Sequence, residues 1–129
     1  MLTTSGYVAL IGTCVAGMGF GARSLPGQWW HDRIASEIGA DHPALQDAWV
    51  LVDLAVRLAY RNQGIGGMLL ETLLASQPCP RALLSTEVAN AGARRLYERT
   101  GWRYLHPGFI FTPGQQSFVV MGREISSGV

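Results

Sequence analysis

The 129-residue sequence predicts one α/β domain, built on a mixed β-sheet with helices on its faces and extending over residues 1–129. Three observations lead to this fold class. Apolar residues make up 48% of the chain, enough for one core, and the length is too short for two ordinary domains. Short apolar runs alternate with segments whose apolar residues recur at helical spacing. Glycine and proline clusters separate these segments, as turns and loops do.

The first elements are expected to be a hairpin followed by a helix. The apolar runs 7–11 and 14–21 predict two strands, and Gly12 between them supplies a tight turn. Residues 24–28 contain a Pro-Gly pair and predict a loop. Residues 29–38 carry apolar side chains at helical spacing, so the sequence indicates a short helix there.

The centre of the chain predicts a strand, a glycine turn and a helix. Residues 48–56 form a nearly continuous aliphatic run, interrupted by Asp53, which is typical of a strand buried on both faces. Glycines at 64, 66 and 67 then open an apolar segment at helical spacing that ends before Pro78. The later elements are predicted as a strand at 82–85, a helix from Asn90 to Gly101, an interrupted strand at 102–105 and 109–112, and a final strand at 117–121.

The uncharged run at 6–22 resembles the apolar part of a secretory signal, but it has no basic flank before it. Its first charge, Arg23, comes after the run. The run is also short and rich in glycine for a membrane span, which takes about 20 apolar residues. Two buried strands are therefore expected here, with no membrane partner. Cys14 and Cys79 match no disulfide framework and suit a reducing cytoplasm.

The charge balance argues against a nucleic-acid partner. Ten basic and nine acidic residues give a net charge of +1, and neither sign forms a run that would follow a phosphate backbone. The cysteines also lack the spacing of metal ligands, so no metal site is expected.

The most informative segment is the glycine-rich turn between the central strand and the helix after it. Its sequence is Arg61-Asn62-Gln63-Gly64-Ile65-Gly66-Gly67. Glycine lets a ligand approach the backbone closely, and free amides at a helix start bind anions such as a pyrophosphate. No Lys-Ser/Thr pair follows, as a Walker loop requires, and the spacing is not that of a dinucleotide fingerprint. A purely structural turn is the alternative.

A second block follows at the distance that one helix and one strand require. It reads Asn90-x-x-Ala93-x-x-Leu96-Tyr97-Glu98-x-x-Gly101-Trp102. Together, Arg61-x-x-Gly64-x-Gly66 after Leu54-Ala55-Val56 and this second block resemble the two conserved blocks of the GNAT superfamily of N-acetyltransferases. The resemblance covers roughly residues 7–125 and implies the GNAT fold, with acetyl-CoA as the acetyl donor.

The resemblance also implies which residues hold acetyl-CoA. Backbone amides of the strand end would bond the pantetheine arm, at Leu54, Ala55 and Val56. Amides of the turn would hold the pyrophosphate, at Asn62, Gln63, Gly64, Ile65, Gly66 and Gly67. Arg61 would lie nearby, and Asn90 would contact the cofactor through its side chain. The strands at 51–56 and 81–86 would splay apart to form a V-shaped opening for acetyl-CoA.

Tyr97 would then lie beside the thioester sulfur. A tyrosine with a pKa near 10 stays protonated at neutral pH and can donate to the departing thiolate, while the Val56 amide can stabilise the oxyanion. From helical spacing alone, the alternative is an amphipathic tyrosine in the core.

The base that deprotonates the amine is harder to assign. Asp53 is the only acid in the central strand and is the candidate, but simple alternation would place it with Leu51 and Ala55, opposite Val50, Val52 and Leu54. The family's strand base corresponds to position 50 or 52, and both are valines here, so Asp53 could instead be a structural hydrogen-bond acceptor. Glu87, His31, Asp32 and an ordered water are further candidates.

The chain departs from the family at its front. The usual first strand and two helices are missing from this sequence, which starts at what resembles the family's second strand, and the 29–38 helix is an unusual insertion. Trp29, Trp30 and His31 could line an acceptor pocket, or the tryptophans could simply pack on the sheet. A second copy could cover the exposed edge and make a homodimer, unless the natural start lies upstream.

These features predict an N-acetyltransferase that moves the acetyl group to a primary amine of an unidentified small molecule or peptide by direct attack. A non-catalytic or truncated acyl-CoA-binding module is the alternative.

Overall fold

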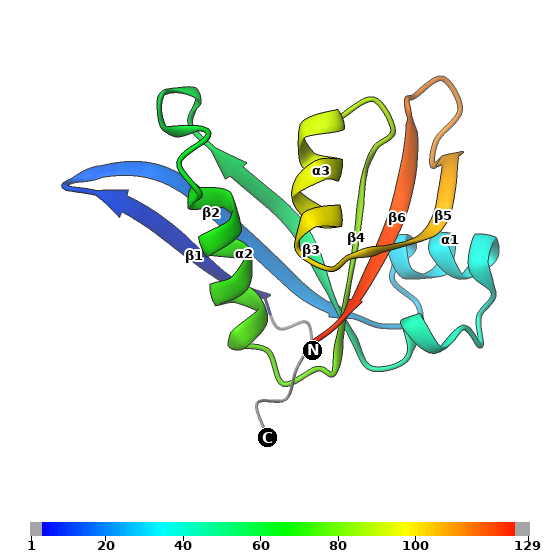
Figure 1. The fold of residues 1–129 in the computed structure, drawn as a ribbon. Helices are drawn as coiled ribbons and strands as arrows, with labels where there is room; N and C mark the ends of the chain where they lie inside the picture. The colour runs from blue at the N-terminus through cyan, green and yellow to red at the C-terminus, as the bar shows by residue number, and fades with distance from the viewer. Residues whose placement is uncertain (1–3, 126–129) are drawn as a thin grey trace.

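The computed structural model describes residues 4–125, which form one six-stranded mixed sheet with three α-helices (Figure 1). The strand order is β1-β2-β3-β4-β6-β5. The strands are β1 (Thr4–Ile11), β2 (Cys14–Ser24), β3 (Ala48–Val56), β4 (Arg81–Glu87), β5 (Arg103–Ile110) and β6 (Ser117–Glu124). The helices are α1 (Trp29–Ile38), α2 (Ile65–Ala75) and α3 (Ala91–Arg99), with short 3-10 turns η1 (Pro43–Leu45) and η2 (Leu58–Tyr60).

The predicted fold class is confirmed, and most elements lie where the sequence indicates. Two details differ. β2 continues through Ser24 into the segment predicted as a loop. The segments predicted at 102–105 and 109–112 are one strand, β5, whose pairing with β6 shifts register after Tyr104 and again after His106. These irregularities absorb the Pro107-Gly108 pair, which cannot join a regular ladder.

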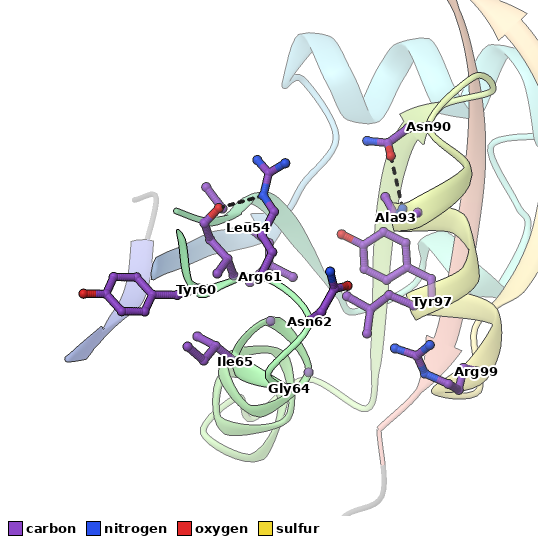
Figure 2. Close-up of a pocket in the computed structure, with 16 residues that line it drawn as sticks. Leu54, Tyr60, Arg61, Asn62, Gly64, Ile65, Asn90, Ala93, Tyr97 and Arg99 are labelled. Atoms are coloured by element: carbon purple, nitrogen blue, oxygen red, sulfur yellow. Dashed lines mark hydrogen bonds between the residues drawn. The ribbon is translucent and has the colours of Figure 1, made fainter. Parts of the chain in front are cut away.

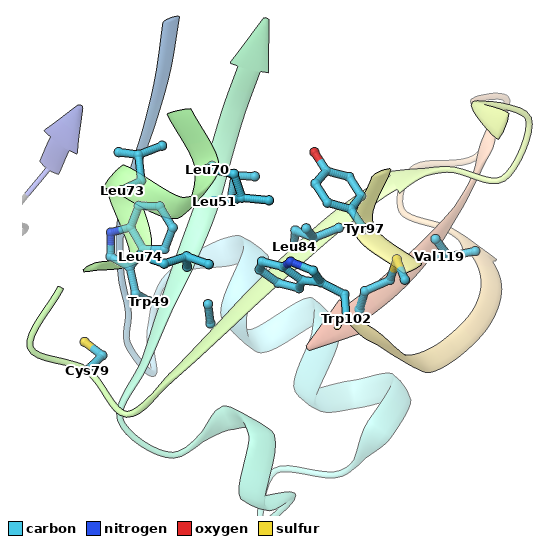
Figure 3. Packing of buried hydrophobic residues seen from close by; sticks show 12 residues of the cluster. Trp49, Leu51, Leu70, Leu73, Leu74, Cys79, Leu84, Tyr97, Trp102 and Val119 are labelled. Atoms are coloured by element: carbon cyan, nitrogen blue, oxygen red, sulfur yellow. The ribbon is translucent and has the colours of Figure 1, made fainter. Parts of the chain in front are cut away.

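The two faces of the sheet are covered by different helices. On one face, leucines of α2 and Tyr97 of α3 pack against Trp49 and Leu51 of β3 and against β4 and β6 (Figure 3). On the other face, Ile34 of α1 packs against Ala48, Leu83 and Val120. The 29–38 helix is therefore not stacked with α2 and α3 but covers the opposite side of β4 and β6.

β3 does not alternate as its sequence suggests. Its pairing with β2 places Phe20 opposite Asp53 but Gly21 opposite Leu51, so Val52 is an extra residue in a β-bulge. Leu51 and Leu54 consequently pack on the same face, against the α2 and α3 side of the core. The expected separation of Leu51 from Leu54 is wrong, because the bulge inserts one residue between them.

The second half of β3 is also more open than a strand buried on both faces. Val52 is 56% exposed, and Asp53 and Ala55 are exposed as well. The reason is that β4 pairs with β3 only from Ala48 to Val50. Beyond that point the two parallel strands diverge, as expected, and leave a V-shaped gap whose α2 and α3 side contains the site described below (Figure 1).

Candidate functional site

A cavity of about 460 Å³ lies where the end of β3, the start of α2 and the exposed face of α3 meet (Figure 2). Its walls come from two segments far apart in sequence, residues 54–67 and 90–99. The lining residues are Leu54, Ala55, Val56, Tyr60, Arg61, Asn62, Gly64, Ile65, Gly66, Gly67, Asn90, Gly92, Ala93, Leu96, Tyr97 and Arg99. The divergence of β3 and β4 therefore brings the two sequence blocks to one cleft.

The glycine-rich turn forms the floor of this cleft. Asn62 and Gly64 both have positive φ, 63° and 80°, so the chain reverses tightly before α2 begins. A Cβ atom added at Gly64 would meet no heavy atom within 4 Å, so the cleft is open beside the backbone there. The amides of residues 62–67 donate no hydrogen bond to any described residue. Several free N–H groups at the start of an eleven-residue helix make an anion site.

Gln63 is the one member of the predicted loop that does not line the cleft. It is exposed and lies between the two residues of positive φ, so the reversal turns it to the outer side of the loop. Arg61 does line the cleft, and its Nε donates to the Val56 carbonyl oxygen at 3.1 Å. This bond ties the loop to the strand end and leaves the terminal guanidinium nitrogens unpaired among the described residues.

The backbone of the β3 end has hydrogen-bonding groups directed into the cleft. The Arg57 amide donates to the Ala16 carbonyl of β2 at 2.8 Å. Because successive amides of a strand point to opposite sides, the Val56 amide points away from β2 and toward the cleft. No neighbouring strand pairs with it there, since β4 has already diverged.

Tyr97 belongs to both the core and the cleft. Its ring is 7% exposed and lies edge-on to Trp102, with 5.7 Å between ring centroids. Its hydroxyl group points into the cleft and has no hydrogen-bond partner among the described residues (Figure 2). Burial, with a smaller effect from the Asp53 carboxylate, raises the pKa of Tyr97 to about 12. The phenol is therefore protonated over the whole physiological pH range.

A smaller cavity of about 180 Å³ continues the cleft between the diverging strands. Asp53 and Tyr97 both line it, together with Ser85 and Thr86 of β4. Asp53 is exposed and accepts no hydrogen bond from any described residue, so the interpretation of Asp53 as a structural acceptor is not supported. The bulge at Val52 is what turns Asp53 toward this cavity rather than the core.

Asn90 caps α3 and also lines the cleft. Its Oδ1 accepts the Ala93 amide at 3.1 Å and caps α3. Its Nδ2 has no described partner and is free to donate to a ligand.

The other candidates for the base differ in whether a neighbouring residue already forms a hydrogen bond with them. His31 is buried, and its Nδ1 lies 2.8 Å from the Ser24 hydroxyl, which is a packing role. Asp32 accepts the Gly27 amide at 3.0 Å and holds the loop before α1. Glu87 is exposed at the end of β4 and makes no ion pair with a described residue.

Sequence reasoning missed several cleft residues, of which Arg99 is the most informative. Its side chain extends from the end of α3 toward the glycine turn (Figure 2). The signal was available, since Arg99 follows Leu96 by three residues, which places the two side chains next to each other on the helix surface. A second guanidinium beside the turn strengthens its anion-binding character.

Within residues 4–125, no group of three or more His, Cys, Asp or Glu side chains could hold a metal ion. No helix in this part of the chain is long and apolar enough to cross a membrane.

A helix that begins on free amides, diverging parallel strands and a buried tyrosine in one cleft define the acyl-CoA N-acyltransferase class. The model of the GNAT acetyltransferase domain family matches residues 6–104, so the chain belongs to that family and is an acetyltransferase. The alternative of a non-catalytic module is accordingly not adopted.

Solved structures agree on the fold. The ribosomal-protein-S18-alanine N-acetyltransferase from Escherichia coli matches with a TM-score of 0.66 and 20% identity over 95% of this chain and 70% of its own. An IAA acetyltransferase from Bacillus cereus matches with a TM-score of 0.66 and 16% identity over 92% and 76%. The NatC complex bound to Gag peptide and CoA contains a chain that matches with a TM-score of 0.71 and 18% identity over 94% and 71%. A comparison with curated proteins finds no sequence match.

Proposed function

We propose that the chain binds acetyl-CoA in the cleft between β3 and α3 and transfers its acetyl group to a primary amine by direct attack. The observation that carries this proposal is the meeting of free turn amides, an unpaired strand end and the Tyr97 hydroxyl in one cavity. Each of these groups matches one part of acetyl-CoA.

The phosphate end of acetyl-CoA would lie on the glycine turn. Free amides of residues 62–67 and the dipole of α2 favour an anion there, and Arg61 and Arg99 add two guanidinium groups. The unpaired edge of β3 suits the pantetheine arm, because its amide groups can extend the strand's hydrogen bonding to Leu54 and Val56. The Asn90 amide nitrogen can donate to the same arm.

The reacting groups would then lie at the far end of the cleft. An alkylamine has a pKa of about 10.4, so at neutral pH it must lose a proton before it can attack. Asp53 is the acceptor available in the smaller cavity, either directly or through one water. The neutral amine forms a C–N bond to the thioester carbon, and the Val56 amide stabilises the resulting oxyanion.

Collapse breaks the C–S bond, and Tyr97 donates to the departing sulfur. A free thiol has a pKa of about 8.5, below that of Tyr97. The value for Tyr97 already includes its burial, whereas about 8.5 is the pKa of a thiol in water. Loss of water in the cleft also disfavours the thiolate anion and raises the pKa of the thiol, which brings it closer to the pKa of Tyr97. As the intermediate collapses, the attacking nitrogen loses its second proton to water. The products are an amide and a free thiol; Tyr97 regains its proton from solvent, and Asp53 returns to solvent the proton it took from the amine.

Acetyl transfer to a panel of primary amines, including small amines and short peptides, tests this proposal. Release of free thiol must equal the amount of acetylated amine, and both must require the protein. Acetyl-CoA binding without acetylation of any amine in the panel would contradict direct transfer to an amine. The free thiols Cys14 and Cys79 suit action in the reducing cytoplasm.

A further inference from the structure

Four aromatic side chains form a continuous group on the α1 side of the sheet. Trp29 lies 5.9 Å from Phe111, and Phe111 lies 4.5 Å from Phe109 and 5.4 Å from Phe118, measured between ring centroids. We call these residues the aromatic group. Trp29 is 63% exposed, although a tryptophan that only covered the sheet would bury most of its ring. Its neighbour Trp30 does pack into the core of this face.

The aromatic group adjoins the cleft from the side opposite α3. Phe118 pairs with Glu87 across β4 and β6, so one end of the group lies beside the end of β4. The indole nitrogen of Trp30 donates to the Ser85 hydroxyl at 3.2 Å, and Ser85 lines the smaller cavity between the strands. Ser85 and Glu87 share the face of Leu83, which packs against α1. The gap between β3 and β4 therefore opens toward the aromatic group on the α1 face of the sheet.

The charge around this opening favours a cation. Asp53 of β3 and Glu87 of β4 have no ion-pair partner among the described residues. Arg94 comes near Glu87, but it donates to the Val88 carbonyl and the Tyr104 hydroxyl. Arg33, on the α1 side, is hydrogen-bonded as well. Its guanidinium lies 4.9 Å from the centre of the Phe109 ring and donates to Glu37 and to the Ile110 carbonyl. Two unpaired carboxylates near one exposed tryptophan and three half-buried phenylalanines match an ammonium group attached to an apolar body.

We propose that the acceptor is a primary amine carrying a large apolar or aromatic group, which lies on Trp29, Phe111 and Phe118 while its nitrogen enters the V between Asp53 and Glu87. This inference rests on the proposed function and names its substrate class. It also assigns α1, the helix between β2 and β3, to the acceptor side of the enzyme.

The test compares phenethylamine with ethylamine, two alkylamines that differ by one phenyl ring. Burial of that ring on the aromatic group is expected to raise kcat/KM by about 10- to 100-fold. Trp29→Ala should remove most of this preference by raising KM for phenethylamine, with KM for ethylamine and the affinity for acetyl-CoA unchanged. Glu87→Gln should raise KM for both amines alike, because it weakens the ammonium contact and not the ring contact.

Ile110→Ala is the matched control. Ile110 is 47% exposed at the end of β5, the strand that carries Phe109. Alternation along the chain turns Ile110 to the face opposite Phe109 and Phe111. This variant should keep the full preference. Equal use of the two amines by the unaltered protein, or a preference that survives Trp29→Ala, would overturn the inference.

A binding measurement separates this inference from the proposed function. Phenethylamine is titrated calorimetrically into protein saturated with CoA, alongside Trp29→Ala. If neither amine is acetylated, the proposed transfer fails, and Trp29-dependent binding still supports the aromatic acceptor surface. Binding that Trp29→Ala leaves unchanged, or no binding at all, would contradict that surface.

Discussion

Replacing Tyr97 with phenylalanine isolates one hydroxyl group in the cleft. The ring is 7% exposed and packs edge-on against Trp102, and phenylalanine keeps that packing. The hydroxyl has no hydrogen-bond partner among the described residues, so no buried group loses a partner when it is removed. Near neutral pH, stability should therefore change by no more than about 0.5 kcal/mol, and acetyl-CoA affinity should be unchanged.

Turnover should fall in this variant because the departing sulfur loses its donor. Positioned proton donors typically contribute about a hundredfold or more, so a loss of about two orders of magnitude in the chemical step is expected. The assay is a single-turnover measurement with saturating amine, which excludes product release. An unchanged single-turnover rate would refute the reasoning and leave Tyr97 with a packing role only.

The same variant carries a pH signature. The folded protein raises the pKa of Tyr97 from 10 to about 12, so it favours the neutral phenol. This contribution to stability is complete below pH 10 and is lost as the pH rises through about 12. By about pH 11 the loss reaches about 1.4 kcal/mol, one pKa unit of differential binding. Urea unfolding at about pH 8 and about pH 11 should show this loss in the unaltered protein and not in Tyr97→Phe, and equal losses would contradict the assignment.

Three further predictions concern other residues. Asn90→Asp keeps the oxygen that caps α3 but removes the amide donor, so thermal stability should hold while acetyl-CoA affinity falls; unchanged affinity would leave Asn90 with the cap alone. Asp53→Asn should slow acetyl transfer and also lower the pKa of Tyr97, since the carboxylate contributes to its rise; tyrosinate absorbance measures the second effect, and an unmoved titration would place the carboxylate elsewhere. The edge strand β1 carries Val8 and Leu10, which are 58% and 62% exposed, so the unaltered protein should self-associate through β1 at micromolar concentration. The double variant Val8→Lys, Leu10→Lys should abolish this self-association, and sedimentation of the unaltered protein as a monomer would refute the prediction.

The fold could be predicted from the sequence because its local signals agree. The glycine turn begins α2 at Ile65, and Asn90 caps α3, as expected from the residues that start helices. The two blocks meet in one cleft because β3 and β4 are parallel neighbours whose ends coincide. Most of the candidate site follows from that topology.

What the sequence did not reveal are features that depend on pairing and on tertiary direction. The bulge at Val52 arises from the register between β2 and β3, and no residue type in β3 indicates it. Without it, Asp53 is assigned to the wrong side of the strand. The face of the sheet that α1 covers depends on packing of Ile34 against Leu83 and Val120, so the sequence could offer Trp29 as a pocket residue without indicating on which face it lies.

Calorimetric titration of acetyl-CoA into three proteins tests the central claim most directly. The unaltered chain is compared with Gly64→Glu and Gly114→Glu. Both glycines have positive φ, 80° and 86°, and an added Cβ atom meets nothing within 4 Å at either. Both variants therefore carry a similar backbone strain and the same added charge. Only Gly64 lies in the cleft. Loss of binding in Gly64→Glu, with Gly114→Glu binding as the unaltered chain does, is the predicted result, and equal acetyl-CoA affinity in all three proteins would contradict the account.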